Sequence, residues 1–383
     1  MSFVAEFVEE VERKKRGLLE LLSDGEGTAR LEAIVGRLEQ HWHRLPAPEQ
    51  SYHQEFSVDS SSASRTLSTG HEFFIIQALM LGSQGTRTPK VWFEMVKGIP
   101  DAAVSHGFER ILRDLMEVEI VRESLPHIPQ GSLVLIDGNL YGRYTHPMKQ
   151  LDLPGWRHLP LQLMESMQRL FQECLERGVT LVGVSKFSKT RALTAALQAE
   201  LGETREPEYL DVELLARVKE GETGYTTPLL LGSYALQRNP DALEDPEKYL
   251  DTFFRELPPS KRGWALEVLK GVPTTPAIAM IHFIPRAHAQ PLRVDIPANI
   301  LGVEKTLWDV KPFEFLTPSL VDPLLGQLVS DFGGRDVYNA LLYVVDREVR
   351  LGGSQVDGVY RSLLSSQLGR PIEYDRSTRR FTH

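Results

Sequence analysis

The sequence predicts an α/β protein in which a mixed central sheet is flanked by helices, with an N-terminal helical arm and a helical insertion. Apolar runs typical of buried strands recur along the chain, and residues 103–125 and 158–177 carry apolar side chains at helical spacing. The first of these helical segments lies between two predicted strands, which permits those strands to run parallel. With 383 residues, 42% hydrophobic and 25% charged, the chain can form one large domain or two ordinary ones.

The N-terminal segment, residues 1–48, is expected to be a helical arm. Two amphipathic helices are predicted there, with a break at residues 23–27 and prolines at the end of the segment. The main domain, residues 49–383, begins with a strand that ends at Asp59. An apolar run over 73–81 then predicts an inner antiparallel strand, and residues 90–96 predict a third.

The rest of the domain alternates helices and strands. Residues 103–125 are a predicted crossover helix, and the strand 133–136 follows it. Prolines interrupt residues 200–262, which we interpret as an insertion. The remaining predicted elements are a helix at 158–177, a strand at 181–184, a hairpin of 277–284 with 292–296, and helices at 318–331 and 336–350.

Composition excludes several classes of protein. The formal net charge of −9 means that any nucleic-acid site must be a local basic groove. Cys174 is the only cysteine, so there is neither a disulfide framework nor a thiolate zinc site. No apolar segment resembles a signal peptide or a membrane span, and no phosphate-binding loop of the Gly-x-x-x-x-Gly-Lys type occurs. We expect a cytoplasmic protein that does not itself bind ATP and has no membrane partner.

Two buried strands each end in an aspartate followed by small residues, at Asp59 and Asp137. A carboxylate there is costly to desolvate unless a cation lies beside it, so the pair suggests a shared divalent ion. Mg²⁺ and Mn²⁺ prefer such oxygen ligands and retain waters, one of which can attack phosphorus. RNase H-like nucleases use this geometry for two-metal phosphodiester hydrolysis. Alternatively, each aspartate only caps a turn after its strand.

A further oxygen ligand is expected from the crossover helix, which offers Glu117, Glu119 and Glu123 shortly before Asp137. We choose Glu117, with Glu119 as the competing choice. Glu117 also lies four residues after Arg113, so a solvated helical ion pair worth about 0.3 kcal/mol is an equal alternative.

Basic residues follow the predicted strand 181–184. Lys186 could neutralise a scissile phosphate, while Lys189 and Arg191 hold the DNA backbone nearby. The alternative is an ordinary basic surface turn.

These residues stand in segments that resemble the NurA nucleases, over most of the chain. The segments at 58–61 and 136–140 resemble that family's Val-Asp-Gly-Ser and Asp-Gly-Ser-Leu stretches, and the segments at 182–186 and 293–297 resemble its Gly-Ile-Ser-Lys and Arg-Val-Glu-Val-Pro stretches. Each motif is weak alone, but their order and placement are fairly specific.

The resemblance extends to a C-terminal Tyr-Pro-x-x-Leu helix, to which Tyr338 and the residues up to Asp346 are similar. Asp346 stands where archaeal members carry a histidine, and it would supply a further hard oxygen ligand. Asn339 replaces the usual proline and Ser60 a glycine, so the backbone there is expected to differ from the family pattern. Tyr338 would orient a phosphate or a water, although an anchoring role for a buried tyrosine is the commoner one.

The resemblance implies a metal-dependent deoxyribonuclease with single-stranded DNA endonuclease and 5'-3' exonuclease activity in DNA end resection and double-strand break repair. It also implies a homodimer docked on a HerA-type hexameric ATPase, and two Mn²⁺ or Mg²⁺ ions held by Asp59, Glu117, Asp137 and Asp346. Two alternatives stay open: a non-catalytic RNase H-like subunit that binds nucleic acid or an ATPase, and an RNase H-like nuclease directed at RNA.

Overall fold

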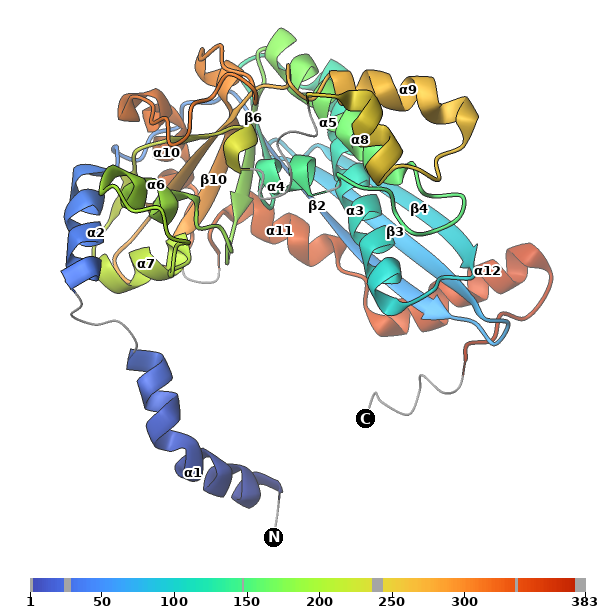
Figure 1. Cartoon of the computed structure of the whole chain (residues 1–383). Coiled ribbons are helices and arrows are strands. Elements are labelled where there is room, and N and C mark those ends of the chain that lie inside the picture. The colour runs from blue at the N-terminus through green and yellow to red at the C-terminus, as the bar shows by residue number, and fades with distance from the viewer. Residues whose placement is uncertain (1–2, 24–28, 147, 236–243, 335–336, 376–383) are drawn as a thin grey trace.

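The computed structural model describes residues 3–23, 29–146, 148–235, 244–334 and 337–375. A ten-stranded mixed sheet runs through the molecule in the order β1-β7-β9-β10-β6-β5-β2-β3-β4, with β8 paired to β9 off this path. Helices cover both faces of the sheet (Figure 1). The predicted α/β class with a flanked mixed sheet is confirmed.

Five neighbouring strands form the central part of the sheet. The strands β2 (Glu55–Thr66), β3 (His71–Gly82) and β4 (Arg87–Lys97) pair antiparallel, as successive hairpins. The helix α3 (Ala102–Ser124) then crosses back, so that β5 (Leu133–Asp137) pairs parallel with β2, and β6 (Thr180–Ser185) parallel with β5. This order, β4-β3-β2-β5-β6, is the RNase H-like arrangement that the sequence predicted.

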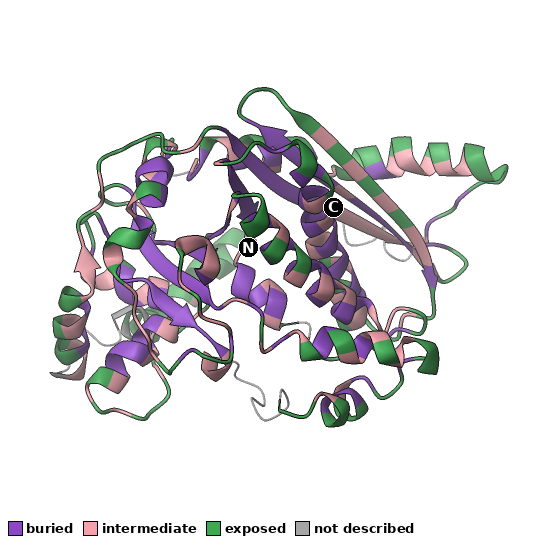
Figure 2. Ribbon diagram, turned by 90° about the horizontal axis from the view of Figure 1, so that it is seen from above, coloured by how far each residue is buried: buried purple, intermediate pink, exposed green. Residues whose placement is uncertain are grey.

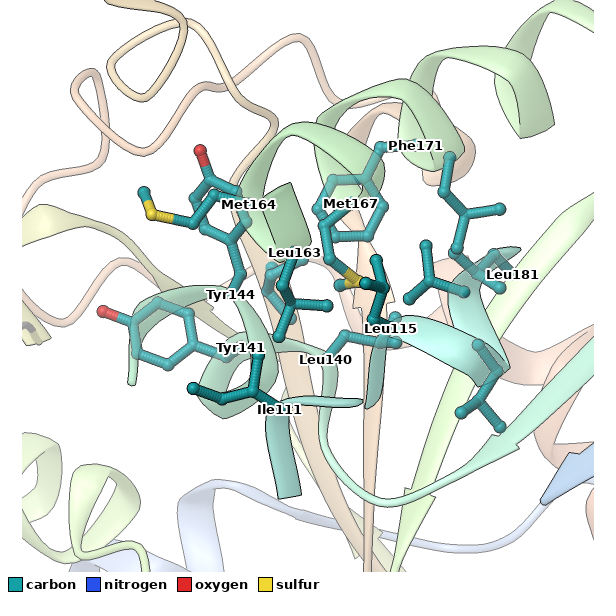
Figure 3. Packing of buried hydrophobic residues seen from close by; sticks show 14 of the residues in the cluster. Ile111, Leu115, Leu140, Tyr141, Tyr144, Leu163, Met164, Met167, Phe171 and Leu181 are labelled. Carbon is teal, nitrogen blue, oxygen red and sulfur yellow. The ribbon is translucent and has the colours of Figure 1, made fainter. Parts of the chain in front are cut away.

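One face of the core sheet is covered by α3 and α5 (Leu159–Glu176). Their apolar sides pack against Val58 and Ile136, which are completely buried. The short helix α4 (Leu140–Thr145) lies in this layer, and Figure 3 shows Leu140, Tyr141 and Tyr144 among the side chains of α3 and α5. This packing fixes the segment that follows Asp137.

The opposite face is covered by α10 (Asp322–Ser330) and α11 (Ala340–Val349). Leu325 and Leu342 of these helices pack against Leu133 and Leu135 of β5. Figure 2 shows that burial is concentrated in the strands between the two helical layers. Each buried strand therefore presents alternate side chains to different helices.

The sheet continues beyond β6 through the predicted late hairpin, β10 (Leu292–Pro297) and β9 (Ile278–Ile284). The segment 200–262, predicted as a helical insertion, contains helices but also contributes β7 (Gly224–Thr226) and β8 (Leu229–Leu231) to the sheet. Strands of three residues give no alternation to detect in a sequence, which explains the difference. This segment contains α7 (Asp211–Val218) and α8 (Pro246–Phe253) and the start of α9 (Pro259–Lys270), and α6 (Ala192–Glu200) precedes it.

The two N-terminal helices differ in placement. The helix α1 (Phe3–Ser23) projects from the body of the molecule (Figure 1), with Phe3 and Phe7 largely exposed. In contrast, α2 (Ala29–Gln40) buries Ile34 and Leu38 in the core, and β1 (Trp42–His43) pairs with β7. The helical arm placed at residues 1–48 is therefore limited to α1, because α2 and β1 belong to the main body. The predicted break at 23–27 falls, from residue 24 on, outside the described residues.

The C-terminal part packs on the hairpin end of the core. A π-helical turn, Gln355–Tyr360, and α12 (Arg361–Leu368) lie beside β3, where Val356 contacts Phe73 and Ile75. The predicted helix 336–350 begins at residue 340 in the structure, and its residue 336 lies outside the described part. Within the described ranges, no helix has the length and apolar character needed to cross a membrane.

Candidate active site

Asp59 and Asp137 lie side by side on neighbouring parallel strands. Val58 of β2 is paired with Ile136 of β5, so the residues that follow each of them are also neighbours. Because side chains alternate along a strand, both aspartates point away from the α3 face on which Val58 and Ile136 pack. The sequence prediction that these two carboxylates converge is consistent with this register.

The two carboxylates disturb each other electrostatically. Burial raises the pKa of Asp59 to about 8, with further contributions from the negative charges of Glu117 and Asp137. Burial also raises the pKa of Asp137, against the opposing effect of Lys186. A cation placed between these groups would remove the repulsion. The site is therefore strained in the absence of positive charge, which is the condition for binding a cation.

The sheet opens next to this pair. The strand β5 ends at Asp137, whereas β2 continues as far as Thr66, so beyond Asp59 this side of β2 has no partner strand. Ser60 points to the α3 face, and its hydroxyl donates a short hydrogen bond to Glu117. Glu117, 1% exposed, thus lies close enough to Asp59 to raise its pKa.

Glu117 is held by a buried arginine that the sequence analysis did not identify. The guanidinium of Arg143, on α4, lies 2.6 Å from a Glu117 carboxylate oxygen and 3.2 Å from a carboxylate oxygen of Asp114. Arg143 also donates to the backbone carbonyl of Asp137. Burial raises the pKa of Glu117, while Arg143 opposes this effect. The alternative of a solvated ion pair with Arg113 is not found, because Arg113 instead donates to the carbonyl of Ser60 at 2.8 Å.

The other two glutamates considered for this role have structural partners. Glu119 pairs with Arg122 at 3.1 Å and accepts from Ser166 of α5. Glu123 pairs with Lys90 of β4. Of the three, only Glu117 accepts a hydrogen bond from Ser60, the residue next to Asp59.

Lys186 and Tyr338 border the aspartates on the opposite side. Lys186 directly follows β6, and its ammonium nitrogen lies 3.9 Å from the centre of the Tyr338 ring. The Tyr338 hydroxyl is buried beside the carboxyl group of Asp137, and its interaction with that group lowers the pKa of Asp137. Burial raises the pKa of Tyr338, and the nearby charge of Asp137 raises it further. Lys186 thus supplies positive charge to Asp137 and is supported by an aromatic face.

Asp346 lies on α11 and is the last of the four carboxylates that the sequence analysis assigns to the metal site. It is partly exposed and forms an ion pair with Arg350 at 2.6 Å, and its charge raises the pKa of Asp137. Asn339 caps α11, since its side chain accepts from the backbone N–H of Leu342 at 2.9 Å. Its amide also donates to Glu55 at 3.1 Å. An asparagine at this position therefore starts the helix that carries Asp346.

Lys189 and Arg191 lie in the loop between β6 and α6 and are exposed. Neither forms an ion pair with any residue that the structure describes. Their charges are therefore open to solvent, in the same loop as Lys186.

A cavity of about 200 Å³ opens beside the site, on the α3 side of the segment after Asp137. It is lined by polar groups from α3 and α4 together with a few apolar side chains. The lining residues are Arg110, Ile111, Asp114, Gly138, Asn139, Gly142, Arg143, His146 and Leu163.

The donor atoms of the site suit a hard divalent cation. Asp59 is buried and Asp137 is partly buried, and desolvation raises the pKa of both carboxyl groups. No cation pairs directly with Asp59 among the described residues. In that same part of the chain, no group of three or more acidic, histidine or cysteine side chains is placed to hold a metal ion together. Glu117 and Asp346 are instead engaged by Arg143 and Arg350. The two aspartates therefore fit a metal, and the two outer carboxylates would have to release or share their arginines.

The fold and this acidic site define a protein of the nuclease class. A family model described as the NurA domain matches residues 53–305, which is most of the chain. The chain belongs to the NurA family.

Solved structures show the same fold. The NurA nuclease from Sulfolobus solfataricus is 14% identical, with a TM-score of 0.60, and the match covers 96% of this chain and 98% of that one. A NurA structure with manganese is 13% identical, with a TM-score of 0.55, over 94% of this chain and 98% of the other. A NurA structure bound to dAMP and manganese is 11% identical, with a TM-score of 0.57, over 93% and 97%. Among curated proteins no match is found.

Proposed function

We propose that the chain is a metal-dependent DNA nuclease that cuts single-stranded DNA and trims 5' ends. The adjacent carboxylates of Asp59, which is buried, and Asp137, which is partly buried, carry this proposal, together with the raised pKa of each. Membership of a nuclease family and the likeness to NurA structures containing manganese and dAMP support it.

In this proposal Asp59 and Asp137 hold Mn²⁺ or Mg²⁺, and Glu117 and Asp346 act as additional ligands for a total of two ions. The metal supplies Lewis acidity to the phosphodiester and lowers the pKa of water. Lys186 places its ammonium beside Asp137, where it neutralises the negative charge that develops on phosphate. Tyr338 holds that ammonium over its ring. Lys189 and Arg191 bind the DNA backbone as exposed cations.

The proposed cellular role is DNA end resection and double-strand break repair in the cytoplasm, as a homodimer bound to a HerA-type hexameric ATPase. The sequence has no phosphate-binding loop, so strand separation would depend on an ATP-driven partner. The apolar side chains exposed on α1 offer a surface for such a partner or for a second copy.

The direct test is cleavage of end-labelled single-stranded DNA by the purified chain with Mn²⁺, with a chelator in the parallel reaction. Products resolved from each labelled end report the direction of digestion, and an RNA of the same sequence tests the RNA-directed alternative. We expect cleavage of the DNA only, lost with chelator and with Asp59→Asn. Asp152→Asn, which changes an exposed aspartate, is the matched control. Full activity of Asp59→Asn would overturn the proposal, and absence of all cleavage, with or without an ATPase partner, would favour a non-catalytic binding subunit.

A further inference from the structure

Phe187 is an exposed aromatic residue at the edge of the acidic site. It follows Lys186, whose ammonium lies over the Tyr338 ring, and 80% of its surface is open to solvent. Single exposed apolar side chains are common on proteins and need no explanation by themselves. Phe187 differs because its backbone and both of its neighbours hold it in this position.

The backbone of Phe187 has a φ of 52°, in the left-handed region that phenylalanine rarely adopts. This conformation is unfavourable for a residue with a Cβ atom, and glycine or asparagine would adopt it more easily. Because the ring is exposed, burial of its apolar surface does not offset this unfavourable backbone conformation. Neither packing nor backbone preference therefore explains a phenylalanine at this position, and residues held in such conformations are frequent at functional sites.

The two neighbours of Phe187 are each held by contacts of their own. Ser188 is buried, and its hydroxyl accepts hydrogen bonds from Arg293 and from the backbone N–H of Thr190, both at 3.4 Å. The carbonyl of Thr190 accepts from the N–H of Asp211, at the start of α7. With Lys186 held on one side and Ser188 on the other, the loop presents the Phe187 ring outward as part of an anchored turn.

The basic residues that share the loop with Phe187 indicate its ligand. Lys186, Lys189 and Arg191 are all exposed within the same loop, although the chain as a whole is acidic. Proteins bind single-stranded nucleic acid with exposed aromatic and basic side chains together: the cations follow the phosphates and the ring stacks on a base. A folded protein partner would instead be expected to contact a broader apolar surface.

We propose that Phe187 is a base-stacking residue, whose ring packs on a nucleobase of single-stranded DNA next to the phosphate at the Asp59–Asp137 site. The proposal deepens the proposed nuclease function and rests on it. The ring would set the position of the strand relative to Lys186 without distinguishing among bases, because every base offers a flat aromatic face.

The experiment measures affinity separately from cleavage. The full-length chain carrying Asp59→Asn is titrated against a fluorescent single-stranded oligonucleotide with Mn²⁺, alone and combined with Phe187→Ala, Phe187→Asn or Phe187→Trp. Loss of one stacked base should weaken binding about 5- to 150-fold in the first two variants. Phe187→Trp should retain affinity, and its fluorescence should be quenched on binding. Phe93→Ala, which removes a half-exposed ring on the edge strand β4, should bind like the parent.

Phe187→Asn also controls for misfolding, because asparagine tolerates a positive φ. Its melting temperature should equal or exceed that of the parent while its DNA affinity falls. A scan of oligonucleotides that each lack one base should then locate the contact: one abasic position should weaken the parent but leave Phe187→Ala unchanged.

Wild-type affinity in both Phe187→Ala and Phe187→Asn would overturn the proposal, as would an abasic scan in which both proteins respond alike at every position. A change in oligomeric state without a change in DNA affinity would also overturn it and make the ring a protein contact. A further outcome is that the wild type cleaves nothing while the Asp59→Asn parent still binds the oligonucleotide. This result would refute the nuclease function, but the effect of Phe187 on DNA affinity could still be measured.

Discussion

The ammonium nitrogen of Lys186 lies 3.9 Å from the centre of the Tyr338 ring, so the residue that follows β6 is held by the residue just before the cap of α11. The contact joins two layers of the fold at the aspartate pair. It gives Tyr338 a supporting role through its ring, in addition to the interaction of its hydroxyl with Asp137.

Tyr338→Phe should therefore retain most of the activity, because it keeps the aromatic face beneath Lys186. Tyr338→Leu should lose the cation–π contact, which is worth about 0.5–2 kcal/mol and corresponds to roughly 2- to 30-fold in kcat. Lys186→Ala should lower kcat roughly 100-fold, as for other groups that stabilise developing charge. Steady-state cleavage of single-stranded DNA with Mn²⁺ gives these values. A larger loss in Tyr338→Phe than in Tyr338→Leu would assign the function to the hydroxyl.

Arg143→Ala should destabilise the fold by about 3–5 kcal/mol, because it leaves the buried Glu117 carboxylate without its cation. Adding Glu117→Gln should recover part of this loss, since the remaining side chain is then neutral. Urea unfolding of the two single variants and the double variant measures the coupling. The control is Arg169→Ala, which breaks an exposed helical ion pair with Glu165 and should cost no more than about 1 kcal/mol. Simple additivity of the Arg143 and Glu117 changes would contradict this account.

Stability should fall as the pH rises from about 4 to about 8 when metal is removed by a chelator. The pKa of Asp59 and that of Glu55 are each raised to about 8, the latter by burial and by the charge of Asp331. A carboxyl group with a raised pKa binds its proton more tightly in the folded chain, so its contribution to stability is lost as it ionises toward pH 8. Mn²⁺ should increase the melting temperature more at pH 8 than at pH 5, because it binds the ionised carboxylates.

Two variants separate the contributions to this pH dependence. Asp59→Asn should flatten the curve and remove most of the Mn²⁺ effect, whereas Glu55→Gln should flatten the curve and keep the Mn²⁺ effect. An equal response to Mn²⁺ at both pH values would show that the metal does not bind ionised Asp59.

Asn339→Ala should cost about 1 kcal/mol, as expected for the loss of a helix N-cap, together with the hydrogen bond to Glu55. Because α11 carries Asp346, we also expect a lower kcat. Asn339→Ser should restore the cap and most of the stability but not the contact with Glu55. Thermal unfolding and cleavage by the same preparations compare these effects, and unchanged stability in Asn339→Ala would show that α11 is held by packing alone.

The core strands and the aspartate pair could be predicted from the sequence because their signals are local. Each strand is an apolar run of ordinary length, and Asp59 and Asp137 stand where those runs stop. That the two aspartates lie close together followed from one rule: a helical crossover lets the two strands run parallel, so that their ends meet at the same edge. The choice between Glu117 and Glu119 depended on which face of α3 lies against the strands. The sequence alone did not determine that face.

Other features of the site arise from tertiary contacts that leave no local pattern. Arg143 lies on a helix of six residues, too short to show periodicity, and its partners come from α3. The only available signal was Asn139, a residue type typical of a helix N-cap. The positive φ of Phe187 likewise results from anchors at both ends of a loop. Asp346 was found through family resemblance, because nothing in its own segment indicates a site.

The guanidinium of Arg293 and the carboxylate of Asp295 form a bidentate pair inside β10, at 2.7 and 2.9 Å. Arg293 also reaches Ser188, and Asp295 accepts from the backbone N–H of Tyr141 at the start of α4. This buried ion pair thus contacts both segments that carry a cation of the site: the loop with Lys186 and the helix α4 with Arg143. A substitution of either Arg293 or Asp295, on a strand outside the acidic site, is therefore expected to disturb both segments at once.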